Sequence, residues 1–234
     1  MKEPLQFGYY LQDGIDTALK ASKDGDHARA AQYWAALAKA VPSRAYAFGR
    51  QCRELALGGD REGALTACEA ACTRDGVTVG DYFLTARLLL NRPGELTADD
   101  RSKVKLLIEH LATQTHVPEA ADQLRCRLAL RDNDVGALQA CTEALGKVSP
   151  GDPQTISFQW ALAMAKHDKS GARRVIEEAK KSAMPPAAIA RMESATDKLG
   201  LGGVVKVGIG ALIAALAVGA VFVRRVKSAR RVAA

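Results

Sequence analysis

Two stretches of this 234-residue chain align without a gap: residues 25–42, GDHARAAQYWAALAKAVP, and residues 59–76, GDREGALTACEAACTRDG. Their opening Gly-Asp pairs are 34 residues apart, and an alanine, Ala30 or Ala64, follows five residues after each Gly. The aligned positions further on are Trp34 with Cys68, Leu37 with Ala71, and Pro42 with Gly76. A fixed period of this length indicates a repeated helical hairpin.

The remaining sequence has the same helical character. Ala and Leu dominate, apolar residues recur at helical spacing, and β-branched runs are scarce before residue 204. The all-α fold that this predicts is divided into helices of about twelve to sixteen residues by turn-forming residues. These breaks are Asp24-Gly25-Asp26, Pro42, Gly58-Gly59-Asp60, Pro93-Gly94, Pro118, Asp132-Asn133-Asp134, Pro150 to Pro153, and Pro185-Pro186.

The period resembles the tetratricopeptide repeat, a 34-residue helical hairpin with small residues where its two helices cross. Residues 25–42 match the second helix of that repeat, with Ala30 at the crossing, Trp34 as the aromatic residue and Pro42 at the end. The Gly-Ala dipeptides Gly63-Ala64, Gly136-Ala137 and Gly171-Ala172 place the crossing Ala in three further units. Alanine there lets two helix axes approach closely.

The resemblance implies a right-handed solenoid of about five hairpins within a helical repeat domain, residues 1–199. We expect the hairpins at 11–44, 45–78, 79–117, 118–152 and 153–185, and a polar-faced capping helix at 186–199. The third hairpin departs most from the pattern. We expect its first helix at 81–90, a loop at 91–100 with about six additional residues, and its second helix at 101–115.

An almost purely apolar stretch runs from Val204 to Val223, after a Gly-rich linker at 200–203. Twenty helical residues span about 30 Å, the thickness of the hydrocarbon core of a bilayer. The sequence therefore predicts a single-pass protein with one C-terminal transmembrane helix, of the kind found in tail-anchored proteins. Small residues recur in this segment at Gly210, Ala211, Ala215 and Gly219, and the last three, spaced by four, would permit a homodimer in the membrane.

A basic tail, residues 224–234, follows this segment and contains Arg224, Arg225, Lys227, Arg230 and Arg231. The 31 residues from 204 onward hold six Lys and Arg and no Asp or Glu, so the rest of the chain carries only about +1 of the net charge of +7. Because the excess charge adjoins the apolar segment, the lipid bilayer is the expected partner of the basic residues and nucleic acid is excluded.

The orientation signals disagree. The basic tail predicts a cytoplasmic C-terminus, which would require an exported repeat domain. No apolar export signal follows Met1, which instead favours a repeat domain in the cytoplasm, at a bacterial inner membrane or an organelle outer membrane. We expect the cytoplasmic placement, and the exported orientation stays open.

Catalytic motifs are absent from the sequence. It has no Gly-Lys-Ser/Thr phosphate loop, no His-Glu-x-x-His, no Cys-x-x-Cys and no nucleophile elbow. We therefore expect a protein that is not an enzyme and holds no cofactor or metal. The four histidines are expected at turns or helix ends in solvated or capping roles, and the paired aspartates at turns as N-caps rather than calcium ligands. These residues are His27, His110, His116 and His167, with Asp24, Asp26, Asp132 and Asp134.

The five cysteines allow two interpretations. Cys52 and Cys68 are 16 residues apart, Cys126 and Cys141 are 15 apart, and Cys72 is left over, so two hairpin-bridging disulfides are one interpretation. With the turn near Gly59, however, Cys52 is expected to face Ala64, about 6 Å along the axis from Cys68. That offset, added to a normal interhelical distance, exceeds the limit of about 7 Å between the Cα atoms of a disulfide. We therefore favour buried reduced thiols, which suit a cytoplasmic domain.

The predicted first helices of the second and third hairpins carry the candidate binding residues. Tyr46, Arg50 and Arg53 are expected to lie near Phe83 and Arg87 in a concave groove that would suit an acidic or C-terminal peptide. Solvated helix faces are the alternative for these arginines. The resulting functional prediction is a membrane-anchored scaffold that binds a protein or peptide partner. The alternative function is an accessory or assembly subunit of a membrane complex for import, secretion or division, whose anchor also makes intramembrane contacts.

Overall fold

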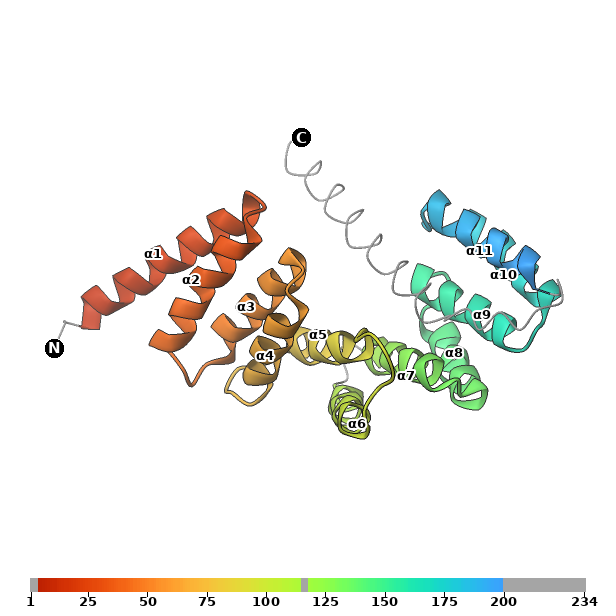
Figure 1. Cartoon of the computed structure of the whole chain (residues 1–234), viewed down its shortest axis with the longest axis horizontal. Coiled ribbons are helices and arrows are strands. Elements are labelled where there is room, and N and C mark those ends of the chain that lie inside the picture. The colour runs from red at the N-terminus through yellow and green to blue at the C-terminus, as the bar shows by residue number, and fades with distance from the viewer. Residues whose placement is uncertain (1–3, 115–117, 200–234) are drawn as a thin grey trace. The chain divides into compact units, whose positions relative to one another are not determined.

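The computed structural model describes residues 4–114 and 118–199, and in these ranges it contains eleven α-helices and no strand (Figure 1). The all-α prediction is thus confirmed for this part of the chain. The helices are α1 (Pro4–Lys23), α2 (His27–Ala40), α3 (Ala45–Gly58), α4 (Arg61–Cys72), α5 (Val79–Leu90), α6 (Ala98–Ala112), α7 (Pro118–Asp132), α8 (Val135–Val148), α9 (Pro153–Ala165), α10 (Lys169–Lys181) and α11 (Pro186–Lys198).

The chain divides between Gln114 and Thr115 into two compact units, so the described part of the predicted repeat domain 1–199 falls into two units. In the first unit each helix from α1 to α6 packs against the next one in sequence, and the second unit repeats this order from α7 to α11. Such sequential packing is consistent with a helical repeat. Most helix ends fall at the predicted Gly, Pro and Asp breaks because these residues stop or cap helices, whereas no such break was predicted between α4 and α5.

Four of the turns between helices share one local structure. A residue with positive φ is followed by an aspartate whose side chain caps the next helix by accepting a backbone N–H. The pairs are Gly25-Asp26, Gly59-Asp60, Asn133-Asp134 and His167-Asp168. The N-cap role expected for Asp26 and Asp134 is therefore confirmed, and the spacing of 34 residues between Asp26 and Asp60 recurs between Asp134 and Asp168.

The helices that follow these aspartates bury the same positions. Residues four, eight and eleven places after each aspartate are buried in α2, α4, α8 and α10. They are Ala30, Trp34 and Leu37 in α2; Ala64, Cys68 and Ala71 in α4; Leu138, Thr142 and Leu145 in α8; and Ala172, Ile176 and Ala179 in α10.

One of the predicted crossing alanines is wrong. Ala30, Ala64 and Ala172 are buried as expected, but Ala137 is exposed. Ala137 lies three places after Asp134, where its backbone N–H donates to the cap, so Leu138 takes the buried position. The Gly136-Ala137 dipeptide matches the sequence pattern, but its alanine lies three places after the capping aspartate and not four.

The third hairpin follows different rules. Its second helix, α6, begins at Ala98 and not at Arg101, because the Thr97 side chain caps it by accepting the Asp100 N–H at 3.0 Å. Its buried residues Val104, Ile108 and Leu111 keep the steps of four and three residues seen in the four other second helices, but they lie seven, eleven and fourteen places after the N-cap Thr97. The predicted lengthening of this hairpin is present in the loop between α5 and α6.

The prediction of a single-pass, tail-anchored membrane protein is corrected. Within residues 4–114 and 118–199 no helix is long and apolar enough to cross a membrane. The longest, α1, has 20 residues but carries Asp13, Asp16, Lys20 and Lys23. The predicted anchor 204–223, its linker 200–203 and the tail 224–234 lie outside the described residues. The finding on the described helices contradicts the predicted membrane localisation. The predicted membrane homodimer and the alternative of a membrane-complex subunit both depended on that localisation.

The prediction of reduced cysteines is wrong. Disulfides join Cys52 to Cys68 and Cys126 to Cys141, with Cα–Cα separations of 5.1 Å and 5.5 Å. The expected offset does not exist, because the N-cap Asp60 lies midway between Cys52 and Cys68 in sequence and puts them opposite each other across the hairpin. Alanines at the crossing then let the two helices approach closely enough.

Candidate partner-binding surface

Helix α3 presents a row of three predicted site residues at helical spacing, Tyr46, Arg50 and Arg53. Tyr46 is 48% exposed, Arg50 is half-buried and Arg53 is exposed. The Arg50 guanidinium carbon lies 5.3 Å from the centre of the Tyr46 ring and 5.9 Å from that of Trp34. This arrangement is a cation–π stack held by two rings.

Trp34 supplies the base of that stack. It belongs to α2, is only 1% exposed, and meets Tyr46 edge to face with the ring centres 5.5 Å apart. The buried indole fixes the Tyr46 ring, and both rings restrict the positions that Arg50 can take. The guanidinium is therefore oriented before any partner arrives.

Helix α5 carries a second arginine–aromatic pair, in which the Arg87 guanidinium carbon lies 5.9 Å from the centre of the Phe83 ring. Both side chains are half-buried. Burial lowers the pKa of Arg87, and its Nε has no hydrogen-bond partner in the described part of the chain. Arginine stays charged in proteins, so this position holds a partly desolvated cation.

The start of α5 is fixed against α3. Asp81 and Thr78 form a capping box, and Asp81 packs so closely on Gly49 of α3 that a Cβ added there would lie 2.3 Å from the carboxylate. The Arg53 guanidinium reaches the same end of α5, where a Cβ on Gly80 would lie 3.9 Å from it. Arg53 thus lies where α3 meets the start of α5.

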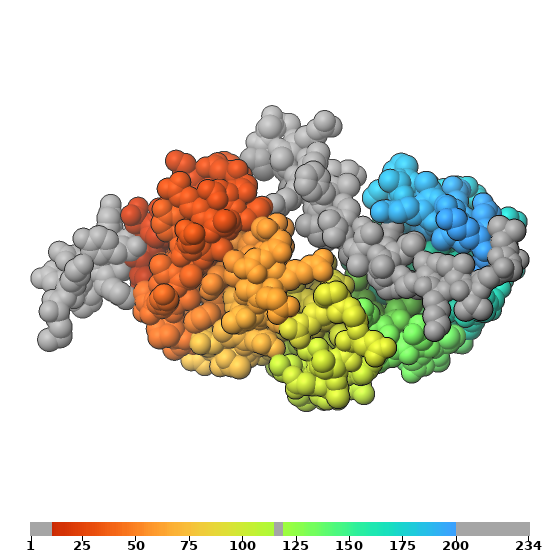
Figure 2. Space-filling model, in the orientation of Figure 1, coloured from red at the N-terminus to blue at the C-terminus, as the bar shows by residue number. Residues whose placement is uncertain are grey.

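We call Tyr46, Arg50, Arg53, Phe83 and Arg87 the arginine–aromatic surface. In the space-filling view α3 to α6 form one continuous surface of the first unit, from orange to yellow (Figure 2). Tyr46 and Arg50 form one arginine–aromatic pair on α3, with Trp34 of α2 beside it, and Phe83 and Arg87 form a second pair on α5.

The arginines of this surface differ from Arg92 in charge pairing. Among the described residues, no carboxylate forms an ion pair with Arg50, Arg53 or Arg87. By contrast, Arg92 pairs with Glu62 and Asp100, each at 3.1 Å. The three arginines of the surface are therefore free to bind an external anion.

A cavity of about 470 Å³ lies elsewhere, between α10 and α11 in the second unit, and Arg173, Glu177 and Asp197 are among its lining residues. Its charges are already paired, because Arg173 contacts Asp197 at 3.2 Å and Lys180 contacts both Glu177 and Glu193. This neutralised cavity is a weaker candidate for a charged ligand.

The histidines occupy the expected kinds of position where the structure describes them. His167 lies in a turn, and His27 begins α2 with its Nδ1 2.7 Å from Glu54. His110, in the last turn of α6, contacts the Tyr82 ring of α5 at a tilt of 47°. His116 lies outside the described residues. No group of three or more His, Cys, Asp or Glu that could hold a metal occurs in residues 4–114 or 118–199.

Sequence reasoning missed Trp34 and Gly80 as parts of the site. Trp34 stood out as the aromatic residue of a second helix, but no spacing rule connects α2 with Arg50 on α3. Gly80 marks the place where the Arg53 guanidinium reaches the start of α5, and only the packing of α5 on α3 reveals that contact.

Comparison with known proteins adds no relative: no protein-family model, no curated protein and no solved structure matches this chain.

Proposed function

We propose that this protein is an interaction scaffold that binds an acidic segment of a partner protein on the arginine–aromatic surface. The observation that carries the proposal is the set of three arginines without carboxylate partners, two of which are stacked on aromatic rings. Consecutive helices that pack in sequence supply the extended surface on which scaffolds of this architecture bind their partners.

The chemistry favours a peptide with carboxylates flanking an apolar side chain. Carboxylates form bidentate, charge-assisted hydrogen bonds with arginine, and the half-exposed Tyr46 ring offers an apolar contact beside Arg50. A carboxylate at Arg87 would also offset the desolvation of that cation, which no described acidic residue does.

Fluorescence anisotropy with synthetic peptides tests the proposal. The probes are a labelled peptide of Glu residues around one Leu and the same peptide with every Glu replaced by Gln. We expect the Glu peptide to bind at least about tenfold more tightly, a difference of roughly 1.4 kcal/mol, with affinity falling as salt rises.

Charge reversal locates the binding site. Arg53→Glu with Arg87→Glu is expected to abolish binding of the Glu peptide without loss of helicity measured by circular dichroism. The matched control, Arg173→Glu with Arg174→Glu, makes the same change in net charge on exposed arginines of the second unit and should leave binding intact. An equal loss of peptide binding in both variants would show that binding depends only on net charge. Unchanged binding in the Arg53→Glu, Arg87→Glu variant would refute the proposed site.

A further inference from the structure

The two disulfides occupy equivalent places in two hairpins. Cys52 and Cys68 lie eight residues before and eight residues after Asp60, the N-cap of α4. Cys126 and Cys141 are centred in the same way on the Asn133-Asp134 turn between α7 and α8. In both hairpins the bond therefore joins the middle of the first helix to the middle of the second.

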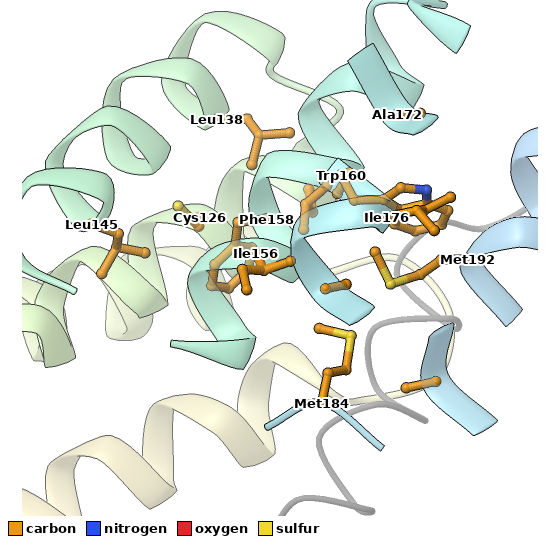
Figure 3. Close-up of a cluster of buried hydrophobic side chains, with 14 of the residues drawn as sticks. Cys126, Leu138, Leu145, Ile156, Phe158, Trp160, Ala172, Ile176, Met184 and Met192 are labelled. Carbon is orange, nitrogen blue, oxygen red and sulfur yellow. The ribbon is translucent and has the colours of Figure 1, made fainter. Parts of the chain in front are cut away.

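Both bonds are part of the core. Cys52, Cys68 and Cys126 have no exposed surface and Cys141 is 4% exposed. Ala64 and Ala67 share the buried cluster of the first bond, and leucines of α3 and α5 pack against it. The second bond belongs to the large apolar cluster that includes Leu138 and Phe158 (Figure 3). Solvent reductants reach such bonds only when the hairpin opens.

We infer that this chain matures in an oxidising compartment, where two matched disulfides lock one hairpin in each unit. Each bond forms when two thiols lose two protons and two electrons to a disulfide-bearing oxidant, which leaves as a dithiol. Four of the five cysteines are consumed in this way. Paired, buried disulfides of this kind persist in oxidising environments and are rare in the cytosol.

The fifth cysteine, Cys72, is poorly placed to exchange with either disulfide. Cys72 lies one turn after Cys68 on α4, close enough in sequence to compete for Cys52. Pairing Cys72 with Cys52 would require an offset of about 6 Å along the helix. Burial raises the pKa of the Cys72 thiol, whose Sγ lies 3.3 Å from Thr85 Oγ1. A thiol that is mostly protonated exchanges slowly with disulfides.

Thiol counting on the full chain from its native cells tests the inference. Cells are quenched in acid, the protein is denatured without reductant in a maleimide, and the products are mapped by peptide mass spectrometry. We expect one adduct per chain, on Cys72, and five after reduction. Five adducts before reduction, or a linkage that includes Cys72, would overturn the inference.

Stability measurements give a second readout that does not depend on the source of the protein. A reductant should lower the melting temperature of the oxidised chain by at least about 10 °C, since closing a loop of this length contributes roughly 3 kcal/mol. Cys52→Ala with Cys68→Ala should lower the melting temperature without reductant, whereas Cys72→Ala should leave it unchanged. A reductant without effect on the wild-type chain would count against any locking role.

Discussion

The two disulfide-bridged hairpins differ in what surrounds them. In the first unit the buried cluster that holds Cys52 and Cys68 also contains Ala64 and Ala67, and Leu55, Leu84 and Leu88 pack against it partly buried. In the second unit the cluster around Cys126 and Cys141 reaches α11 and includes Phe158, Trp160 and Met192 (Figure 3). Both hairpins have the same turn, N-cap and disulfide. The first packs its buried alanines closely, whereas the second belongs to a core of larger apolar side chains.

Equivalent positions show the difference directly. Four residues after the capping aspartate, α4 has Ala64 and α8 has Leu138, and both side chains are almost completely buried. Close packing leaves little tolerance for a change of volume in either direction. The two units should therefore respond differently to opposite substitutions.

Exchanging these two residues gives the largest expected effect. Leu138→Ala should lower the free energy of unfolding of the second unit by about 2–5 kcal/mol, because it leaves a cavity. Ala64→Leu should cost the first unit about 1–3 kcal/mol through overpacking. Urea unfolding in single-tryptophan backgrounds measures each unit, since Trp34 reports on the first and Trp160 on the second. If Ala64→Leu were neutral, the contrast between the two cores would not hold.

The turns offer an intermediate effect. The residue with positive φ is Gly59 before α4 but His167 before α10, at 89° and 55°. For residues other than glycine, this left-handed backbone conformation costs roughly 1–2 kcal/mol of folding free energy. We expect His167→Gly to stabilise the second unit by about 1 kcal/mol and Gly59→His to destabilise the first by a similar amount. Thermal unfolding followed by circular dichroism checks both predictions. Stabilisation by Gly59→His would show that the positive φ of this turn does not determine the stability of the first unit.

The smallest effect concerns the cap of α10 and depends on pH. The Gly171 N–H and the Ser170 hydroxyl donate hydrogen bonds to Asp168 and lower the pKa of its carboxyl. Its contribution to stability is complete above the pKa of the unfolded chain and is lost as the pH falls through the lower pKa of the folded state. Asp168→Asn keeps a cap but does not titrate. The gap in melting temperature between wild type and this variant should close in acid, and a constant gap would exclude the carboxylate charge as its cause.

Much of the fold was readable from the sequence because turns are local. Gly, Pro and Asp at the breaks set the helix ends through backbone conformation and capping, which involve only neighbouring residues. The Ala137 error shows the limit of a motif: the dipeptide alone does not define how far it lies from the cap. The distance from the N-cap sets the buried position, and Ala137 lies three places after the N-cap Asp134 where the other crossing alanines lie four places after theirs.

The site and the disulfides depended on contacts between helices. The stripe of Tyr46, Arg50 and Arg53 was visible as helical spacing, but the contribution of Trp34 was not. For the first disulfide, the assumed centre of the turn was slightly wrong, and this error was enough to predict that Cys52 and Cys68 are offset along the helices when they face each other. Errors of this size do not change a fold, yet they decide whether two sulfur atoms can bond.

The loop between α5 and α6 shifts the phase of the repeat. Asp60 and Asp134 are 74 residues apart, six more than two periods of 34, while the aspartate pairs on either side keep the period. One residue inserted at Gly59 would rotate all of α4 by about 100° and carry Cys68 away from Cys52. Pro93, Gly94 and Glu95, by contrast, are exposed and belong to no disulfide-bridged hairpin. This loop is where the chain can change its length while both locked hairpins keep their register.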